Sequence, residues 1–237
     1  MGDLKLTSSA FSDGGEIPRK YGYNNGNISP PLTIENIPFP AKTLTLIMDD
    51  PDAMNVEING EKPFKDPYVH WVVYNISAFK DLSSGDKPGR KIEIPESSAS
   101  VSPITLTDWE EQTATTERFN EFLVKSYGSA FCMLGINGWK EFAYGGPAPP
   151  SGIDFPVRHK YFFRLFALRI GSYQEYAQIP KPSFGEQQAK KDKGRPLLLT
   201  AESVKMAIKN HIIEEATLTG TYQTDEEFAK TNSSPKS

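Results

Sequence analysis

Short apolar or alternating runs, separated by turn-forming residues, are the feature that most limits how this chain can fold. The runs lie at residues 43–48, 68–76, 159–168 and 218–222, and proline, glycine or asparagine bounds them. With 19 prolines and 18 glycines among 237 residues, breakers are frequent enough to keep such runs short. Runs of this length and pattern predict β-strands, so we expect a mainly β fold with peripheral α-helices.

Helical spacing of apolar residues is limited to two segments. Residues 201–216 follow Thr200, which is suited to cap a helix, and they repeat apolar side chains at helical spacing. Residues 108–127 predict a second helix, because Thr107 and Glu110 have the spacing of a capping box. We expect its apolar stripe to cover the core or to offer a surface for a partner.

Three segments lack either periodicity. Residues 83–103 are rich in serine, glycine and proline and predict a long surface loop. Residues 181–196 carry clustered lysines and predict a solvated loop, and the polar tail at 224–237 is expected to be flexible. No repeat or boundary divides the rest, so we predict one domain over residues 1–223.

Composition argues against several classes of protein. A net charge of -4 does not favour binding to a nucleic-acid backbone. The lone Cys132 cannot form an intramolecular disulfide, and no run of about 18 apolar residues suggests a membrane span. With no secretory leader pattern at the N-terminus, we expect a cytoplasmic protein that does not insert stably into membranes.

Histidines mark the candidate site, because His70 and His159 lie in the two most distinctive stretches of the chain. On a strand, side chains alternate between faces, so His159 and Tyr161 are expected to point to the same ligand. The same alternation predicts that His70, Val72 and Tyr74 share one face. Either histidine alone would more often be a structural residue.

Two further segments have the composition of a pocket rim. Asp50 and Asp52 flank Pro51 and are expected in a turn just after a strand. Residues 145–152 combine glycines with prolines, which predicts a rigid wall whose glycine N–H groups could bind an anion. The prolines lack donors and the chain has no phosphate-binding loop motif of the Gly-x-x-x-x-Gly-Lys-Thr type.

These segments together resemble the signatures of the phosphatidylethanolamine-binding proteins, and in particular their prokaryotic subgroup, the Raf-kinase-inhibitor-like proteins. The resemblance covers roughly residues 4 to 222. It rests on the order and joint presence of several short motifs, which are Ile28-Ser29-Pro30-Pro31-Leu32, Asp50-Pro51-Asp52-Ala53, His70-Trp71-Val72-Val73-Tyr74-Asn75, Tyr144-Gly145-Gly146-Pro147-Ala148-Pro149-Pro150 and His159-Lys160-Tyr161-Phe162-Phe163.

The resemblance implies a single domain with an antiparallel two-sheet core, and a small cavity that holds phosphate, a phosphorylated headgroup or a similar anion. By motif, the residues that line this cavity are Asp50, Asp52, His70, Gly146, His159 and Tyr161, with Pro149 and Pro150 as a wall. Imidazole and phenol groups can donate hydrogen bonds to phosphate oxygens. We expect an aspartate to orient a neighbouring imidazole, and no cofactor is implied.

The chain departs from the family pattern at four places. Lys160 stands where the family usually has arginine, and Met54 stands where a proline is expected. The link at residues 153–158 is longer than expected and could lie over the pocket. Residues 83–134 form an insertion relative to small family members, and any preference for a partner could reside there.

The leading interpretation is a non-enzymatic protein that binds a small anionic ligand and possesses a regulatory output, such as inhibition of a kinase or a protease. One alternative is a metal-dependent enzyme in which His70, His159 and Asp50 or Asp52 hold a divalent ion. Another is that the pocket is vestigial and the protein acts through residues 83–134 or 181–196 on a protein target.

Overall fold

Two β-sheets and a covering helix make up the architecture of the computed structural model, which describes residues 3–78, 90–96, 133–150, 157–171 and 200–233. The smaller sheet has the strand order β1-β3-β6, and the larger sheet has the order β2-β9-β8-β4-β5-β7. The strands are β1 (Lys5–Thr7), β2 (Gly15–Glu16), β3 (Leu32–Ile37), β4 (Thr43–Asp50), β5 (Tyr68–Ser77), β6 (Arg90–Ile94), β7 (Met133–Leu134), β8 (Arg158–Leu168) and β9 (Ile212–Gln223).

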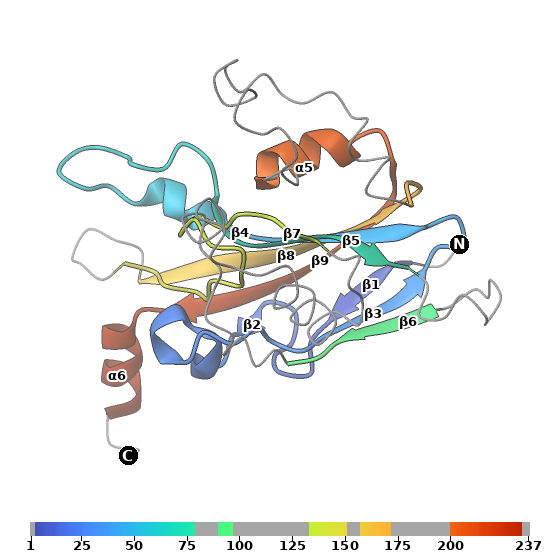
Figure 1. Cartoon of the computed structure of the whole chain (residues 1–237). Coiled ribbons are helices and arrows are strands. Elements are labelled where there is room, and N and C mark those ends of the chain that lie inside the picture. Colours follow the sequence, from blue (N-terminus) through green and yellow to red (C-terminus); the bar gives the residue numbers. More distant parts are fainter. Residues whose placement is uncertain (1–2, 79–89, 97–132, 151–156, 172–199, 234–237) are drawn as a thin grey trace, which may run out of the picture.

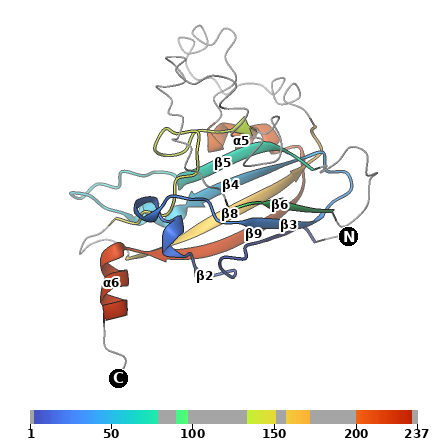
Figure 2. The ribbon, with the colours of Figure 1, turned by 60° about the horizontal axis from the view of Figure 1, so that its bottom comes forward.

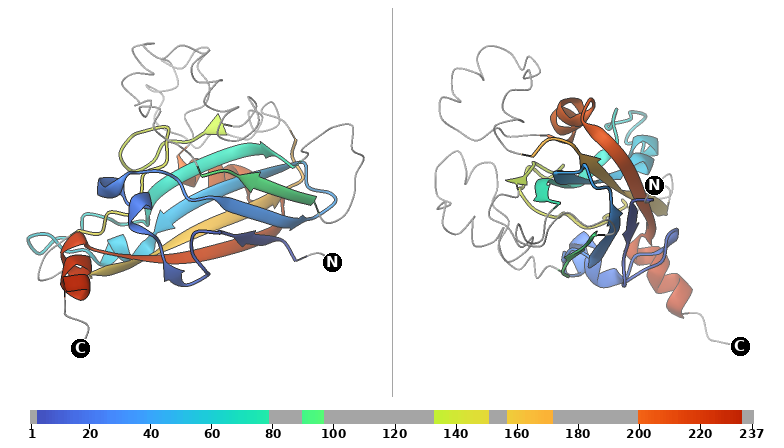
Figure 3. Two further views of the ribbon diagram at one scale, coloured as in Figure 1. Left: turned by 90° about the horizontal axis from the view of Figure 1, so that it is seen from below. Right: turned by 90° about the vertical axis from the view of Figure 1, so that its right-hand side faces the viewer.

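The elements lie in three layers. In Figure 1 the helix α5 (Ala201–Ile208) lies on one side of the larger sheet, and the smaller sheet lies on the other. The views in Figure 3 show the same arrangement from below and from one side. Neighbouring strands are antiparallel, except that β2 runs parallel to β9. The predicted two-sheet, mainly β single domain is therefore confirmed.

Alternation along β8 explains why the larger sheet is buried on both faces. Tyr161, Phe163 and Leu165 are fully buried in the core between the two sheets. Phe166 and Leu168 belong to a second apolar cluster, which packs against α5. Asp49 on the α5 side is also buried, and it accepts hydrogen bonds from Arg164 Nε at 2.9 Å and from Lys205 Nζ of α5 at 3.1 Å.

The four predicted strands are confirmed, but the prediction of a helix over residues 201–216 is wrong in its second half. Thr200 does cap α5, since its side chain accepts a hydrogen bond from the backbone N–H of Ser203. The helix ends at Ile208, and the chain enters β9 at Ile212. Pairing of residues 212–223 with β8 along its whole length overrides the local helical spacing.

Two loop predictions also need correction. Within the expected loop at 83–103, residues 90–94 form β6, whose Ile92 and Ile94 pack on the core and whose backbone pairs with β3. Within the expected tail, residues 225–233 form the helix α6 (Asp225–Ser233). The predicted helix at 108–127 and the lysine-rich loop at 181–196 lie outside the described residues.

The helix α6 extends away from the sheets, as Figure 2 shows, and one arginine links it to the N-terminal part of the chain. Arg19 lies in the turn η1 (Arg19–Tyr21), forms an ion pair with Asp225 and donates a hydrogen bond to the Gln223 carbonyl at 2.9 Å. Its guanidinium group also lies over the rings of Tyr222 and Phe228, at 4.2 and 4.7 Å from their centroids.

No helix in the described ranges is long and apolar enough to cross a membrane.

Candidate functional site

A β-bulge in β5 decides where His70 points. The register of β4 with β5 shifts between the pairs Met48–Trp71 and Asp49–Val69, so His70 is the extra residue. Val72 packs on the α5 side of the sheet, whereas the ring of His70 contacts Tyr161 on the opposite side. The prediction that His70, Val72 and Tyr74 share a face is therefore wrong, because the bulge re-aims one side chain.

The carboxylate of Asp50 holds the second histidine. Asp50 is the last residue of β4 and caps the turn η3 (Pro51–Asn55), with Oδ1 accepting from the Ala53 N–H at 3.2 Å. Its other oxygen, Oδ2, lies 2.7 Å from Nδ1 of His159. Both side chains are buried. The expected orientation of an imidazole by an aspartate is thus present in the geometry, and it leaves His159 Nε2 buried without a protein partner among the described residues.

His70 is also held through its Nδ1, in this case by two backbone carbonyls. Its Nδ1 lies 2.8 Å from the Gly145 oxygen and 3.1 Å from the Gly146 oxygen. Carbonyl oxygens only accept hydrogen bonds, so Nδ1 carries the proton and the second ring nitrogen, Nε2, remains for other partners. Burial lowers the pKa of His70 below its usual 6.5, and the negative charge of Asp50 only partly opposes this effect.

Tyr161 lies next to both imidazoles. Its ring centroid is 5.1 Å from that of His70, edge to face, and 6.4 Å from that of His159. Burial raises the pKa of Tyr161 well above 10, and the charge of Asp50 adds to the rise. In the described part of the chain the Tyr161 hydroxyl has no hydrogen-bond partner. The backbone N–H of Ala148 lies near it and offsets part of the rise in the pKa of Tyr161.

The glycines after Tyr144 form the wall through their carbonyls rather than through their N–H groups. The Gly145 N–H donates to the His70 carbonyl at 2.8 Å, and the Gly146 N–H donates to Asn27 Oδ1 at 2.7 Å. The expectation that glycine N–H groups could bind an anion is therefore wrong for Gly145 and Gly146, and Gly152 lies outside the described residues. A Cβ atom at Gly146 would lie 2.1 Å from the Tyr21 carbonyl oxygen, so only glycine fits there.

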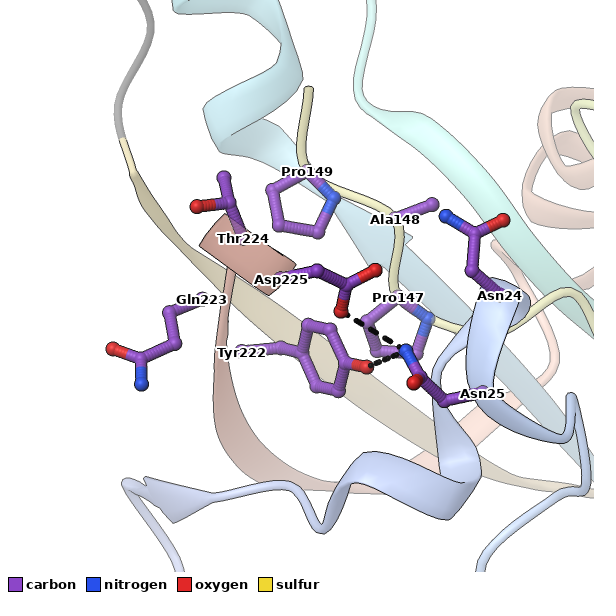
Figure 4. Close-up of a pocket in the computed structure, with 9 residues that line it drawn as sticks. All are labelled: Asn24, Asn25, Pro147, Ala148, Pro149, Tyr222, Gln223, Thr224 and Asp225. Atoms are coloured by element: carbon purple, nitrogen blue, oxygen red, sulfur yellow. Dashed lines mark hydrogen bonds between the residues drawn. The ribbon is translucent and has the colours of Figure 1, made fainter. Parts of the chain in front are cut away.

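A shallow pocket, partly open to solvent, lies beside the wall. In Figure 4 the side chain of Asn25 reaches towards Tyr222 and Asp225, and it donates to the Tyr222 hydroxyl and to Asp225 Oδ1, both at 3.0 Å. The pocket is lined by Asn24, Asn25, Pro147, Ala148, Pro149, Tyr222, Gln223, Thr224 and Asp225. Of the predicted site residues, this pocket includes Pro149.

Among the described residues, no hydrogen bond or ion pair joins Asp52 to His70 or His159. Its Oδ2 accepts the backbone N–H of Lys160 at 2.7 Å, which ties η3 to the start of β8. The Lys160 side chain is exposed on the face opposite His159, as the alternation predicts. Pro150 and Met54 are half-buried, and the link at 153–156 lies outside the described residues.

Aromatic side chains around His70 were not predicted from the sequence. The rings of Trp139 and Tyr68 lie at 5.1 and 5.4 Å from the imidazole, and Tyr23 stacks on Trp139 at 4.5 Å. Asn27, at a left-handed φ of 52°, was missed as the residue that holds Gly146. Its place next to Gly26 and just before the Ile28 motif was the available signal.

The metal-dependent alternative requires histidine and carboxylate side chains that converge on one point. Across the described ranges, no group of three or more His, Cys, Asp and Glu side chains is arranged to hold a metal ion. Of the two carboxylates that this alternative names, Asp50 pairs with Nδ1 of His159 and Asp52 accepts the backbone N–H of Lys160.

Comparisons with known proteins agree with this fold. The family model described as phosphatidylethanolamine-binding protein matches residues 7–223. A UPF0098 protein of Methanothermobacter thermautotrophicus is 33% identical over 70% of this chain and 76% of its own length. Another UPF0098 protein, from Chlamydia muridarum, is 28% identical over 94% of this chain and all of its own length.

Two solved structures share the fold. The phosphatidylethanolamine-binding protein homolog CT736 of Chlamydia trachomatis superposes with a TM-score of 0.57 at 26% identity, over 95% of this chain and 100% of its own. YbcL of E. coli, described as a member of the mammalian family, has a TM-score of 0.59 over 94% of this chain and 99% of its own. At 19% identity, the second match supports the fold alone.

Proposed function

Because the chain belongs to the phosphatidylethanolamine-binding protein family, we propose that it binds a small anionic ligand, such as phosphate or a phosphorylated headgroup, at His70, His159 and Tyr161. One observation carries the proposal. Each imidazole is fixed through Nδ1, and His159 Nε2 and the Tyr161 hydroxyl are buried without protein partners in the described residues. Buried polar groups normally have partners, so a ligand is the natural one.

The chemistry of these groups suits an oxyanion. A protonated imidazole and a phenol can each donate a hydrogen bond to a phosphoryl oxygen, and bonds that involve a charged group are the stronger ones. The Asp50 carboxylate fixes the ring of His159, and the carbonyls of Gly145 and Gly146 fix the ring of His70. Binding at a preorganised site costs less conformational entropy.

The proposed role is binding and regulation rather than catalysis. Binding needs no bond to be broken, and the proposed output is inhibition of a kinase or a protease by the ligand-binding domain. The single cysteine suits a reducing compartment, so we place this activity in the cytoplasm. Of the predicted lining residues, Asp52, Gly146, Pro149 and Pro150 are proposed to position the site or to form its wall, while Asp50 is proposed to orient His159.

The test is an NMR titration of the histidine ring protons with phosphate and with phosphoethanolamine near pH 6.5. The chain has three histidines, and single His→Ala variants assign their signals. The signals of His70 and His159 are expected to shift together and to saturate with each ligand. His211, which lies in the turn between α5 and β9, is the internal control and is expected not to move.

Two results would contradict the proposal. If neither ligand moves His70 or His159 at millimolar concentration, the site is not an anion site. If His211 shifts as strongly as the other two, the ligands act through non-specific charge, and the assignment to the buried pair fails.

A further inference from the structure

We propose that the site selects the protonated form of a phosphoryl group, with His159 donating a hydrogen bond to one ligand oxygen and His70 accepting one from a ligand P–OH. This inference rests on the proposed function and names the chemical form of its ligand. It follows from the different partners that hold the two imidazoles.

His70 is built to present an acceptor. Its Nδ1 proton is committed to the carbonyls of Gly145 and Gly146, at 2.8 and 3.1 Å. In the neutral ring Nε2 therefore carries a lone pair, and a bare phosphate oxygen cannot donate to it. The ring is buried in an aromatic environment that includes Trp139 and Tyr68, which disfavours a second proton.

The ionisable groups around His70 do not reverse this preference. Asp49 and Asp50 of β4 favour the charged ring through space, while Tyr68 of β5 and Tyr161 of β8 face it with neutral phenols. Burial outweighs both carboxylates, and the pKa of His70 is lowered. Asp49 is also neutralised by Arg164 and Lys205 on the far face of the sheet.

His159 is built to present a donor. Its Nδ1 lies 2.7 Å from the Asp50 carboxylate, which can balance the charge of an imidazolium when an anion approaches. Its buried Nε2 would then direct an N–H at the ligand. Tyr161 lies next to both rings and its hydroxyl can donate or accept, so it does not decide between ligand forms.

One donor and one acceptor together match an oxyanion that carries one proton. A phosphate monoester loses its second proton with a pKa of about 6, so the matching form is present at mildly acid pH and scarce at pH 8. A sulfate ester has the same shape and a single negative charge but no proton to donate. The difference between the two esters therefore isolates the hydrogen bond to His70.

The experiment compares phosphoethanolamine with ethanolamine O-sulfate by isothermal titration calorimetry on the full chain, from pH 5 to pH 8. At pH 5.5 the two ligands have nearly equal charge, and the phosphate ester is expected to bind about tenfold or more tightly. Its advantage is expected to shrink as pH rises past about 6, because its P–OH proton is lost. The sulfate ester reports the titration of the protein alone and corrects for it.

The result that overturns this inference is equal affinity for the two esters at pH 5.5, or a phosphate advantage that grows towards pH 8. Either outcome leaves the proposed anion site standing. If neither ester binds at any pH, the proposed function itself fails. A nitrogen-15 spectrum of the phosphate complex adds an independent readout, since His70 is expected to remain a neutral ring, and an imidazolium signal there would refute the assignment.

A variant sharpens the comparison. His70→Gln carries an amide in place of Nε2 and can present an N–H to the ligand. The ratio of phosphate to sulfate affinity is therefore expected to fall towards one, whereas the matched control His211→Gln is expected to retain the wild-type ratio. Circular dichroism checks that both variants fold, and the wild-type ester comparison decides the question if His70→Gln does not.

Discussion

The imidazole of His159 and the carboxylate of Asp50 form a buried pair, with Nδ1 and Oδ2 2.7 Å apart. The two residues are 109 positions apart in the sequence and meet because β4 and β8 are neighbours in the larger sheet. Because the carboxylate occupies Nδ1, the other nitrogen of the ring is the one available to a ligand. The pair therefore fixes both the orientation and the tautomer of His159.

We predict that Asp50→Asn weakens binding of phosphoethanolamine by about tenfold. An asparagine amide would donate to Nδ1 and remove the charge that balances an imidazolium. Calorimetry measures the affinity, and nitrogen-15 shifts report the tautomer. Asp52→Asn is the matched comparison, because Asp52 binds a backbone N–H of Lys160, and a smaller loss is expected. Equal losses in both variants would show that the pairing with His159 is not what matters.

Gly146→Ala is expected to destabilise the fold by about 2–3 kcal/mol, since the new methyl group would meet the Tyr21 carbonyl at 2.1 Å. Urea unfolding measures the change in the free energy of unfolding. Gly60→Ala separates steric clash from backbone strain: Gly60 has open space around its Cβ position but a φ of 82°, so a loss of about 1 kcal/mol is expected. A loss at Gly146 no larger than that at Gly60 would contradict the close packing.

Stability is expected to fall with acidification through His70. Its pKa is lowered in the folded state, so below about 6.5 the unfolded chain binds a proton that the folded ring resists. The contribution of His70 is thus fully present above pH 6.5 and is lost as pH falls towards the folded pKa. Urea unfolding between pH 5 and pH 8 measures this slope. His70→Asn retains a donor for the glycine carbonyls but cannot titrate, so its slope is expected to be flatter; an unchanged slope would exclude the effect.

Substitutions of Lys205 and of the buried Asp49 with which it pairs should have unequal effects on stability. Lys205 is 41% exposed and can be hydrated when unpaired, so Lys205→Met is expected to cost no more than about 1 kcal/mol. Asp49→Asn leaves Arg164 and Lys205 facing a neutral amide in a buried position, and about 2–3 kcal/mol is expected. Thermal or urea unfolding tests the order of these two effects, and a reversed order would refute it.

Removing the Arg19 side chain should free α6 without unfolding the sheets. Arg19→Ala loses the ion pair with Asp225 and the contacts with Tyr222 and Phe228. Amide hydrogen exchange at residues 225–233 is expected to accelerate by about tenfold or more, while β4 and β8 remain protected. Arg19→Lys keeps the charge but not the planar stacking, and it is expected to give an intermediate rate. Unchanged exchange in α6 would show that other contacts hold it.

Local patterns in the sequence were sufficient to predict the four strands, because the apolar residues that define each run are mostly buried in the structure. In β8 the alternation that predicts a shared face for His159 and Tyr161 is the arrangement observed, since no bulge interrupts the strand between them. The same rule failed for His70. A bulge is a property of the pairing between β4 and β5, and the sequence of β5 alone carries no sign of it.

The remaining errors have the same physical origin. Residues 212–216 have helical spacing, but pairing with β8 places them in β9. Residues 90–94 look like loop until β3 supplies a partner. At the site, Asn27 contacts Gly146 and Trp139 contacts His70. These contacts form only when segments distant in the sequence come together in the fold. The histidines and glycines of the site were predicted because hydrogen bonding by imidazole and the small size of glycine are properties of the residue type and do not depend on the fold.

The parallel pairing of β2 with β9 has a consequence for synthesis on the ribosome. Gly15 and Glu16 are made long before their partners, Gly220 and Thr221. Residues 15–16 must wait for β9 to be translated before they gain those hydrogen bonds, and β8 likewise lacks one neighbour until β9 emerges. The sheet can close only after β9 has left the ribosome, so the nascent protein exposes the edge of β8 in the interval and is then most open to chaperones or to wrong pairing.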